Sequence, residues 1–323
     1  MSSSKLKLLV DTDCGVDDAM ALLLALSSSR GHVVGVTCCA GNTTLDNVCD
    51  NVKRVLVVCK KTGIPIYRGS NGPLLTRKRR IVKVYHAEDG LGGAAHRFPT
   101  GELVEASAPA AMALVELTRS HPGELTLVAL GPLTNVAMAH RIDPEFTRRL
   151  KAIVCMGGNY KGLGNTTEVS EFNFYFDPEA ADMVLGEALC PITLVPWETC
   201  LNFGLKLSLY DKQIQAPTAK GRFYKKITSK MLERAKARGR DFTTDCDLLA
   251  VAAALYPEAI TSTVESPLAV ECGGTYSRGL TILLNEESLK EQDRQGCKVK
   301  IVTGLDIDVL DLLRYDMLNN GLL

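Results

Sequence analysis

Four carboxylates near the start of the chain are the residues whose types and spacing most clearly suggest chemistry. Directly after the mostly apolar run Leu6 to Val10, eight positions hold four acids: Asp11, Asp13, Asp17 and Asp18. Acids this close would repel one another unless a cation neutralised them, and Ca²⁺ and Mg²⁺ prefer oxygen ligands of this kind. Capping of a following helix is the alternative, because its dipole favours Asp17 and Asp18 in the first turn. Four acids exceed what capping needs, and we favour a divalent cation site.

The surrounding sequence indicates how these acids are positioned. The apolar run ends at Val10, Gly15 provides a turn, and the helix-forming stretch Ala19 to Leu26 comes next. We interpret this order as a buried parallel strand, a turn and a helix. In open α/β sheets the loops after the carboxyl ends of the strands form the usual ligand crevice, so the acids are expected there.

Strand-like and helix-like segments continue to alternate along the chain. Further strands are expected over residues 32–39, 64–67, 124–130, 151–156, 191–196, 268–272 and 298–303. Further helices are expected over residues 47–59, 108–120, 207–238 and 248–255. We therefore predict an α/β fold: a single domain over residues 1–323, with a mostly parallel, Rossmann-like open sheet, helices on both faces and the active site at the carboxyl ends of the strands.

Composition narrows the possible partners. The 323 residues are 46% hydrophobic and 23% charged, with a formal net charge of +0, which gives no reason to expect nucleic acid or an anionic membrane as a partner. The basic run Arg77–Arg80 lacks interleaved aromatic residues, and we interpret it as a solvated face rather than a nucleic-acid or nuclear-import patch.

Cysteine usage and the absence of long apolar runs bear on location. Eleven cysteines are scattered without a Cys-x-x-Cys pair, and several lie in apolar strand-like runs. We expect them to be reduced and mostly buried, which predicts a cytoplasmic protein. No apolar run is long enough to span a bilayer, and the residues before the first strand are too few for a signal peptide.

Several segments together resemble one enzyme family. Asp11–Asp18 reads Asp-Thr-Asp-Cys-Gly-Val-Asp-Asp, which resembles the signature Asp-x-Asp-Pro-Gly-x-Asp-Asp of the inosine–uridine-type nucleoside hydrolases, with Cys14 in place of proline. Other segments similar to the family occur in order, up to about Pro257: Gly41-Asn42, Gly131-Pro132-Leu133-Thr134-Asn135, Met156-Gly157-Gly158 and Glu171-Phe172-Asn173. The resemblance implies Ca²⁺-dependent hydrolysis of the N-glycosidic bond of ribonucleosides, giving ribose and a free base. Because the family forms dimers and tetramers, a homodimer or homotetramer is expected.

The resemblance also implies the ligands of the metal. Asp13, Asp18 and Asp247 would supply carboxylates and Leu130 its backbone carbonyl, with Asp11 in or just behind this shell. Family members often have Thr at the position of Leu130, but a carbonyl ligand does not depend on the side chain. Asp13 is the implied base, which takes a proton from a metal-bound water. From the residues alone, helix capping is a sufficient explanation for Asp247.

A second set of residues is implied to hold the substrate. The ribose would be bound by five polar side chains: Asp17, Asn42, Asn165, Glu171 and Asn173. Met156 would pack nearby, and His86, in a loop that resembles the family's His-Gly-x-x-Gly-x-Gly segment, would approach the substrate. Ala87 replaces the first glycine of that loop. On composition alone, each assignment has an alternative. Asn42 could lie in a plain turn, His86 could be a surface histidine, and Asn165 could belong to a polar surface loop.

Cys246 stands where most family members carry a histidine that protonates the departing base, and it matches a cysteine-bearing subgroup. A thiol with a pKa of about 8.5 is mostly protonated at neutral pH and could donate that proton, whereas an inert buried thiol is the alternative. Phe223 or Tyr224 is a candidate to stack on the base. Trp197 is expected in the core or at the rim, and the preferred base stays open.

Two other functions fit parts of the sequence. A phosphatase of the haloacid-dehalogenase type also opens with Asp-x-Asp after a strand, but it requires Thr or Val where this chain has Gly15. The second alternative is a non-catalytic ribonucleoside-binding protein, which lost turnover when cysteine replaced the family's histidine at position 246. Release of ribose, release of phosphate, or tight binding without product distinguishes the three.

Overall fold

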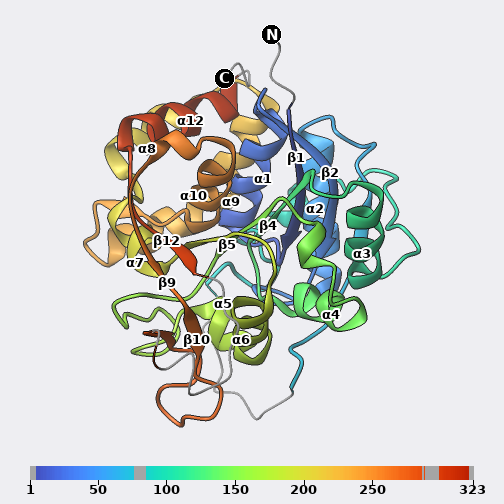
Figure 1. The fold of residues 1–323 in the computed structure, drawn as a ribbon. Coiled ribbons are helices and arrows are strands. Elements are labelled where there is room, and N and C mark those ends of the chain that lie inside the picture. Colours follow the sequence, from blue (N-terminus) through green and yellow to red (C-terminus); the bar gives the residue numbers. More distant parts are fainter. Residues whose placement is uncertain (1–4, 76–84, 286, 288–297, 320–323) are drawn as a thin grey trace.

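A sheet of eight strands forms the centre of the molecule. The computed structural model describes residues 5–75, 85–285, 287 and 298–319 (Figure 1). The strand order is β3-β2-β1-β4-β5-β6-β12-β9, and every neighbouring pair is parallel except β12 and β9. The basic run Arg77–Arg80 lies outside the described residues, so its solvated face stays a prediction.

The strand order places the acids at the reversal point of the sheet. The eight strands are β1 (Leu6–Thr12), β2 (Gly31–Cys38), β3 (Ile66–Arg68), β4 (Leu125–Ala129), β5 (Ala152–Met156), β6 (Ile192–Val195), β9 (Ile260–Ser266) and β12 (Val299–Leu305). The order 3-2-1-4-5-6 is that of a doubly wound sheet, whose ligand crevice lies where the order reverses. Here the reversal falls between β1 and β4, and Asp11 is paired in register with Ala129 at that point.

Helices cover both faces of the sheet. One layer contains α1 (Val16–Ser27), α2 (Leu45–Val58), α9 (Ala219–Ala237), α10 (Cys246–Leu255) and α12 (Ile307–Asn319). The other contains α3 (Ala110–Ser120), α4 (Thr134–Ile142) and α6 (Pro178–Glu187). Figure 1 shows α1, α10 and α12 on one side of the sheet and α3 and α4 on the other. The predicted mostly parallel α/β sheet with helices on both faces is confirmed.

The central strand β1 belongs to two hydrophobic cores at once. Leu8 and Val10 pack with the layer that contains α1 and α10, whereas Leu9 packs with the layer that contains α3 and α4. Successive side chains of a strand point to opposite faces, so a strand buried on both sides needs a continuous apolar run. The acids after this run are therefore held at the end of one of the best-buried strands.

Short elements complete the described fold. They are the helices α5 (Phe172–Phe176), α7 (Trp197–Asn202) and α8 (Leu207–Gln213), the 3₁₀ turns Ala95–Arg97, Thr147–Arg149 and Pro257–Ala259, and the two-stranded pairs β7 (Leu205–Lys206) with β8 (Phe242–Thr243) and β10 (Leu268–Val270) with β11 (Thr281–Leu283). The antiparallel edge strand β9 and the short helix α5 were not predicted from the sequence. The strand predicted at 268–272 forms β10, outside the main sheet.

The single helix predicted over residues 207–238 is wrong, because the structure has two. Helix α8 ends at Gln213 and α9 begins at Ala219, with Pro217 between them. Proline cannot donate a backbone hydrogen bond and disfavours a helical residue before it, so the break is explained by that residue. Thr218 then caps α9, with its hydroxyl accepting the N–H of Gly221 at 2.9 Å.

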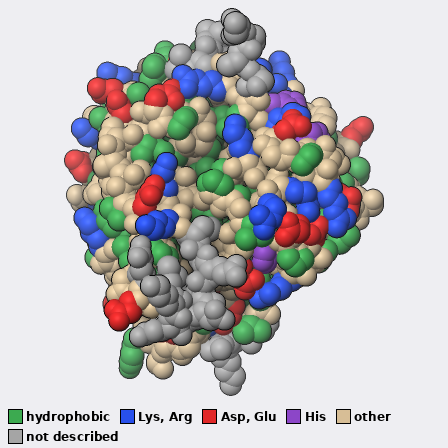
Figure 2. All heavy atoms as spheres, viewed as in Figure 1, with side chains coloured by type: hydrophobic (Ala, Val, Ile, Leu, Met, Phe, Trp, Pro, Cys, Tyr) green, Lys and Arg blue, Asp and Glu red, His purple; other side chains and the backbone are tan. Residues whose placement is uncertain are grey.

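The state of the cysteines and the distribution of surface charge agree with what the composition predicts. The ten cysteines in the described residues are free, and eight of them are buried. No helix in this part of the chain is long and apolar enough to cross a membrane. On the face shown in Figure 2, the coloured acidic and basic side chains are interspersed rather than gathered by sign.

Candidate active site

A cavity of about 840 Å³ gathers most of the predicted site residues. Ten of them line it: Asp17, Asn42, His86, Leu130, Met156, Asn165, Glu171, Asn173, Cys246 and Asp247. They come after different strands of the sheet or begin helices that cover it, so only the fold brings them together. Asp13 and Asp18 are absent from the lining and fully buried.

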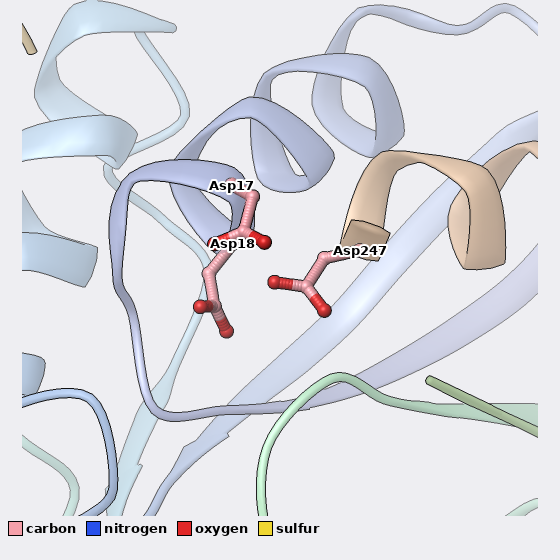
Figure 3. Close-up of side chains that lie close together, drawn as sticks. All are labelled: Asp17, Asp18 and Asp247. Carbon is pink, nitrogen blue, oxygen red and sulfur yellow. The ribbon is translucent and has the colours of Figure 1, made fainter. Parts of the chain in front are cut away.

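Two helix N-termini bring three acids to one point. Asp17 and Asp18 lie in the first turn of α1, and Asp247 lies in the first turn of α10. One carboxylate oxygen of each lies within 4.8 Å of the others. Figure 3 shows Asp247 directed from α10 towards the two acids of α1. Both helix dipoles favour negative charge at this point.

Asp18 is held by donors on three sides. Thr12 Oγ1 donates to Asp18 Oδ1 at 2.5 Å, and the backbone N–H of Gly15 donates to Oδ2 at 2.9 Å. Asn42 Nδ2 also donates to Oδ2, at 3.0 Å. The carboxylate orientation is therefore set by the end of β1, the turn and the loop after β2 together.

Asp13 is enclosed by backbone as well as by donors. Asn42 donates to both of its oxygens, from the backbone N–H to Oδ2 at 2.6 Å and from Nδ2 to Oδ1 at 3.1 Å. A Cβ on Gly131 would lie 3.0 Å from Asp13 Cγ, and one on Gly41 would lie 2.9 Å from the same atom. These glycines let two loops approach the carboxylate closely.

Asp11 lies behind this group at the end of β1. Thr37 Oγ1 and Asn135 Nδ2 both donate to its Oδ1, at 2.5 and 2.8 Å, while Oδ2 is buried and lacks a hydrogen-bond partner among the described residues. Burial raises the pKa of Asp11 to about 7. The role of Asn135 was missed from the sequence, although it belongs to the Thr-Asn pair that comes after β4.

Burial and mutual repulsion dominate the electrostatics. Burial, and then the charge of Asp18, raises the pKa of Asp17 to about 8. Burial, together with the neighbouring acids, raises the pKa values of Asp13 and Asp247 well above the usual range. In the described part of the chain, Asp17 Oδ1 is buried without a hydrogen-bond partner. Crowded carboxylates with an unsatisfied oxygen form a donor set that fits a hard divalent cation.

His86 faces the same acids from the 85–98 segment. The backbone N–H of Val16 donates to Nδ1 of His86 at 3.1 Å, so the proton of the neutral ring lies on Nε2, which is 3.7 Å from Asp17 Oδ1. Burial lowers the pKa of His86 to about 4. The ring is buried, which excludes the surface histidine considered as an alternative. Ala87 next to it has a φ of 62°, in the left-handed region.

Hydrogen bonds among Glu171, Asn173 and nearby backbone groups organise a second part of the cavity lining. Glu171 accepts the backbone N–H groups of Gly158 and Asn173 at 2.9 Å each. Asn173 Nδ2 donates to the carbonyls of Leu130 and Met156, at 2.8 and 3.1 Å. Burial raises the pKa of Glu171 to about 7. The Leu130 carbonyl keeps a second lone pair, whereas Asn165 is exposed at the rim.

Cys246 lines the cavity at the start of α10. A hydrogen bond with Cys200, together with burial, raises the pKa of its thiol well above the usual range. Its neighbour Asp245 is fully buried and pairs with Arg314. The thiol therefore keeps its proton at neutral pH.

The stacking role predicted for Phe223 or Tyr224 is wrong. Both are fully buried and neither lines the cavity, because Phe223 packs edge-on against Phe98 at 4.8 Å between ring centroids and Tyr224 donates to Gln213. Their spacing from the buried Ile227 and Met231 is that of a helix face turned to the core. The cavity lining also includes Tyr85, Trp197, Leu201, Arg238, Arg240 and Thr244. None of these had an assigned role from the sequence, where Trp197 was expected in the core or at the rim.

The fold and the site define a class: a doubly wound α/β protein with a buried oxygen-donor cluster suited to a divalent cation. Comparison with known proteins then identifies the family. Residues 8–311 match the family described as inosine-uridine preferring nucleoside hydrolase. The chain belongs to this nucleoside hydrolase family, which removes the haloacid-dehalogenase alternative.

Individual relatives agree with the family. "Probable uridine nucleosidase 2" of Arabidopsis thaliana is 42% identical over 179 residues, 55% of each chain, so this match spans about half the length of that relative. "Pyrimidine-specific ribonucleoside hydrolase RihA" of Salmonella paratyphi A is 33% identical over 90% of this chain and 95% of its own. The solved structure of "Inosine-Guanosine Nucleoside Hydrolase (IG-NH)" superimposes with a TM-score of 0.87 at 28% identity, covering 98% of this chain and 99% of that one.

Proposed function

We propose that this protein hydrolyses the N-glycosidic bond of ribonucleosides, giving ribose and a free base, and that it needs Ca²⁺ to do so. The observation that carries the proposal is the convergence of Asp17, Asp18 and Asp247 within 4.8 Å, on a cavity of about 840 Å³. Cavities of several hundred cubic ångströms are typical of small-molecule sites. Family membership supports the same reaction.

The proposed ligands of the cation are Asp13, Asp18, Asp247 and the Leu130 carbonyl. All four are oxygen donors, and all are buried at the junction of β1, β4 and α10. Hard oxygen donors of this kind, mostly carboxylates, favour Ca²⁺ over softer metals. Bound there, the cation would lower the pKa of a coordinated water and help to orient the sugar.

Asp13 is the proposed general base, which accepts a proton from the attacking water. Asn42 holds both oxygens of its carboxylate, so the group has one orientation in the site. Breaking the N-glycosidic bond builds positive charge on the sugar ring, and preorganised carboxylates and amide oxygens around the ring stabilise that charge. The crowded acids therefore serve the reaction as well as the cation.

Seven residues are proposed to hold the substrate: Asp17, Asn42, His86, Met156, Asn165, Glu171 and Asn173. Sugar hydroxyls need both donors and acceptors, and this set offers carboxylate oxygens, amides and the Nε2–H of His86. Glu171 and Asn173 are tied to each other and to the backbone, which suits a rigid sugar site. Met156 supplies an apolar surface beside them.

Cys246 is the proposed acid for the departing base. Its thiol lines the cavity and keeps its proton, because the hydrogen bond with Cys200 and burial raise its pKa. Two relatives carry uridine or pyrimidine in their names, so uridine is the first substrate to test. On the family resemblance and the free, mostly buried cysteines, we further propose a cytoplasmic homodimer or homotetramer.

The direct test is release of reducing sugar from inosine, adenosine, guanosine, uridine and cytidine. We expect release that EDTA removes and added Ca²⁺ restores. Asp13→Ala should lower kcat by about 10²- to 10⁴-fold in a folded protein, the usual contribution of a general base. Full activity without metal, or in Asp13→Ala, would contradict the assignment.

The role of Cys246 needs a comparison of leaving groups. Cys246→Ala should slow inosine more than p-nitrophenyl riboside, because an activated leaving group needs no proton. Equal slowing of both substrates would argue against an acid role. Tight Ca²⁺ and nucleoside binding without any product would instead support the non-catalytic binding protein.

A further inference from the structure

Arg314 is the largest side chain that is fully buried among the described residues. It lies on α12, the helix that packs against α1 and α10 and carries no residue of the proposed chemistry. A guanidinium is costly to bury unless its donors are matched by acceptors. The contacts of Arg314 therefore indicate what its burial serves.

Those contacts join two segments whose neighbouring residues line the cavity. Nε and Nη2 of Arg314 donate to the two oxygens of Asp245, at 2.7 and 2.8 Å, and neither side chain is exposed. Nη2 also donates to the carbonyl of Phe203 at 2.7 Å, and Nη1 donates to Asp311 at 2.9 Å. Arg314 thus links α12 to the residue before α10 and to the residue after α7.

Both linked points lie next to residues of the site. Asp245 precedes Cys246 and Asp247 directly, and it makes no side-chain cap of its own for α10. Phe203 directly follows α7, which carries Trp197 and Leu201 of the cavity lining. Because the Asp245 carboxylate does not bond to the first turn of α10, the bidentate contact with Arg314 is what fixes its orientation.

We propose that Arg314, acting through Asp245, is a positioning residue that sets the start of α10 and so aligns Asp247 with Asp18, its partner in the proposed cation site, and with the neighbouring Asp17. The proposal rests on the metal site of the proposed function and assigns no chemistry to Arg314 itself. A bidentate guanidinium has the rigid geometry to hold a carboxylate and a carbonyl together, which a lysine cannot reproduce. Replacing buried ion pairs by apolar residues is often neutral for stability, so a role in alignment accounts for a pair placed here.

The experiment separates alignment from folding by removing both partners at once. The double variant Asp245→Leu with Arg314→Met leaves neither partner of the pair as an unpaired buried charge. Binding of Ca²⁺ to the EDTA-stripped, desalted full-length protein is measured by calorimetry, and kcat and KM for uridine are measured in excess Ca²⁺. The matched control is Arg149→Met, which removes a guanidinium that pairs with Asp143 at 2.6 Å and lines no part of the cavity.

We expect the double variant to unfold as cooperatively as the unmodified protein but to bind Ca²⁺ about 10- to 100-fold more weakly, the usual effect of losing a partner that orients a ligand. Arg314→Lys keeps the charge, so its Ca²⁺ affinity should lie between those of the unmodified protein and the double variant. Arg149→Met should bind Ca²⁺ as the unmodified protein does. A double variant that is folded and keeps the original Ca²⁺ affinity would overturn the proposal.

The readouts also distinguish this proposal from the proposed function. If the unmodified protein binds Ca²⁺ but releases no ribose, the reaction is wrong while the affinity comparison still decides the role of Arg314. If the unmodified protein binds no Ca²⁺, both fail. If the double variant does not fold, Arg314→Lys decides, and an unchanged affinity in that folded variant would overturn the proposal.

Discussion

Asn42 binds both carboxylate oxygens of Asp13, one through its backbone N–H at 2.6 Å and the other through its side chain at 3.1 Å. The same Nδ2 reaches Asp18 at 3.0 Å. One amide thus fixes the relative orientation of two acids that come from the turn and the helix after β1. The loop after β2 is therefore part of the apparatus that orders the acid cluster.

Replacing Asn42 by Ala tests this arrangement. We expect kcat/KM for the best nucleoside to fall about 10- to 100-fold, because the backbone bond to Asp13 remains while the side-chain bonds to Asp13 and Asp18 are lost. Steady-state kinetics in excess Ca²⁺ provide the measurement. Asn319→Ala, which removes an amide bonded to the Tyr315 carbonyl, is the control. Equal kcat/KM values in both variants would show that the Asn42 side chain has no role in the site.

The close approach of Gly41 to Asp13 gives a steric prediction. A methyl group at Gly41 would overlap the Asp13 carboxylate, lying 2.9 Å from its Cγ, whereas a methyl at Gly63 meets no atom within 4 Å. Displacing a catalytic group by about 1 Å can cost about 100-fold in rate. We expect Gly41→Ala to lose about 100-fold in kcat and Gly63→Ala to keep full activity. Full activity in Gly41→Ala would contradict this prediction, because it would show that the loop can move away without displacing the Asp13 carboxylate.

The crowded acids predict how pH changes the stability of the metal-free protein. The folded-state pKa values of Asp11 and Asp17 are about 7 and about 8, against 3.8 for an ordinary aspartate. Asp11 and Asp17 thus hold more protons in the folded state than in the unfolded state between these values. The lowered pKa of His86 acts in the opposite direction between about 4 and 6.5, but it is one group against two carboxyls. The free energy of unfolding is therefore expected to fall as pH rises from about 4 to about 8. Urea unfolding of EDTA-treated protein at several pH values measures this slope.

Adding Ca²⁺ should change that slope. A cation competes with protons for the same carboxylates, so its stabilising effect is expected to be larger at pH 8 than at pH 5, with protons released on binding. Asp11→Asn, which removes one raised carboxyl, should flatten the metal-free slope. Stability that rises with pH in the absence of metal would contradict the predicted direction.

The left-handed conformation of Ala87 predicts a stabilising substitution. Its φ of 62° is costly for a residue with a Cβ, by about 1 kcal/mol, and free for glycine. Ala87→Gly should therefore raise the free energy of unfolding by up to about 1 kcal/mol and leave kcat unchanged. Ala94→Gly, where φ is −108°, should lower it, because glycine there only adds freedom to the unfolded chain. Stabilisation by both substitutions would refute the conformational explanation.

Much of the fold could be predicted because its signals are local. The apolar runs of β1, β2 and β4 are each continuous in the sequence, and parallel strands place the loops after them at one edge of the sheet. The break at Pro217 is equally local, because a proline disfavours a helical conformation of the residue before it. The buried face of Phe223, Ile227 and Met231 has the helical period, which argues for core rather than for a base contact.

The parts that could not be predicted depend on pairs distant in the chain. Nothing near Arg314 indicates that its guanidinium meets Asp245, and nothing near Asn135 indicates that its amide meets Asp11. Tyr85 and Arg238 reach the cavity only because their segments lie side by side in the fold, where Arg234 of α9 packs over the Tyr85 ring. Contacts of this kind leave no periodic pattern in the sequence, so they become visible only in the three-dimensional structure.

The separation of the acids along the chain has a consequence for refolding. Asp17 and Asp18 come just after the first strand, whereas Asp247 is contributed by a helix that comes after six strands of the main sheet. Bringing such distant residues together requires closing long loops, which slows the formation of these contacts. A partly folded chain that keeps β1 and α1 but lacks a docked α10 has no complete cluster. Recovery of ribose release after dilution from denaturant would then report the last step of folding, and should lag behind the return of helical circular dichroism.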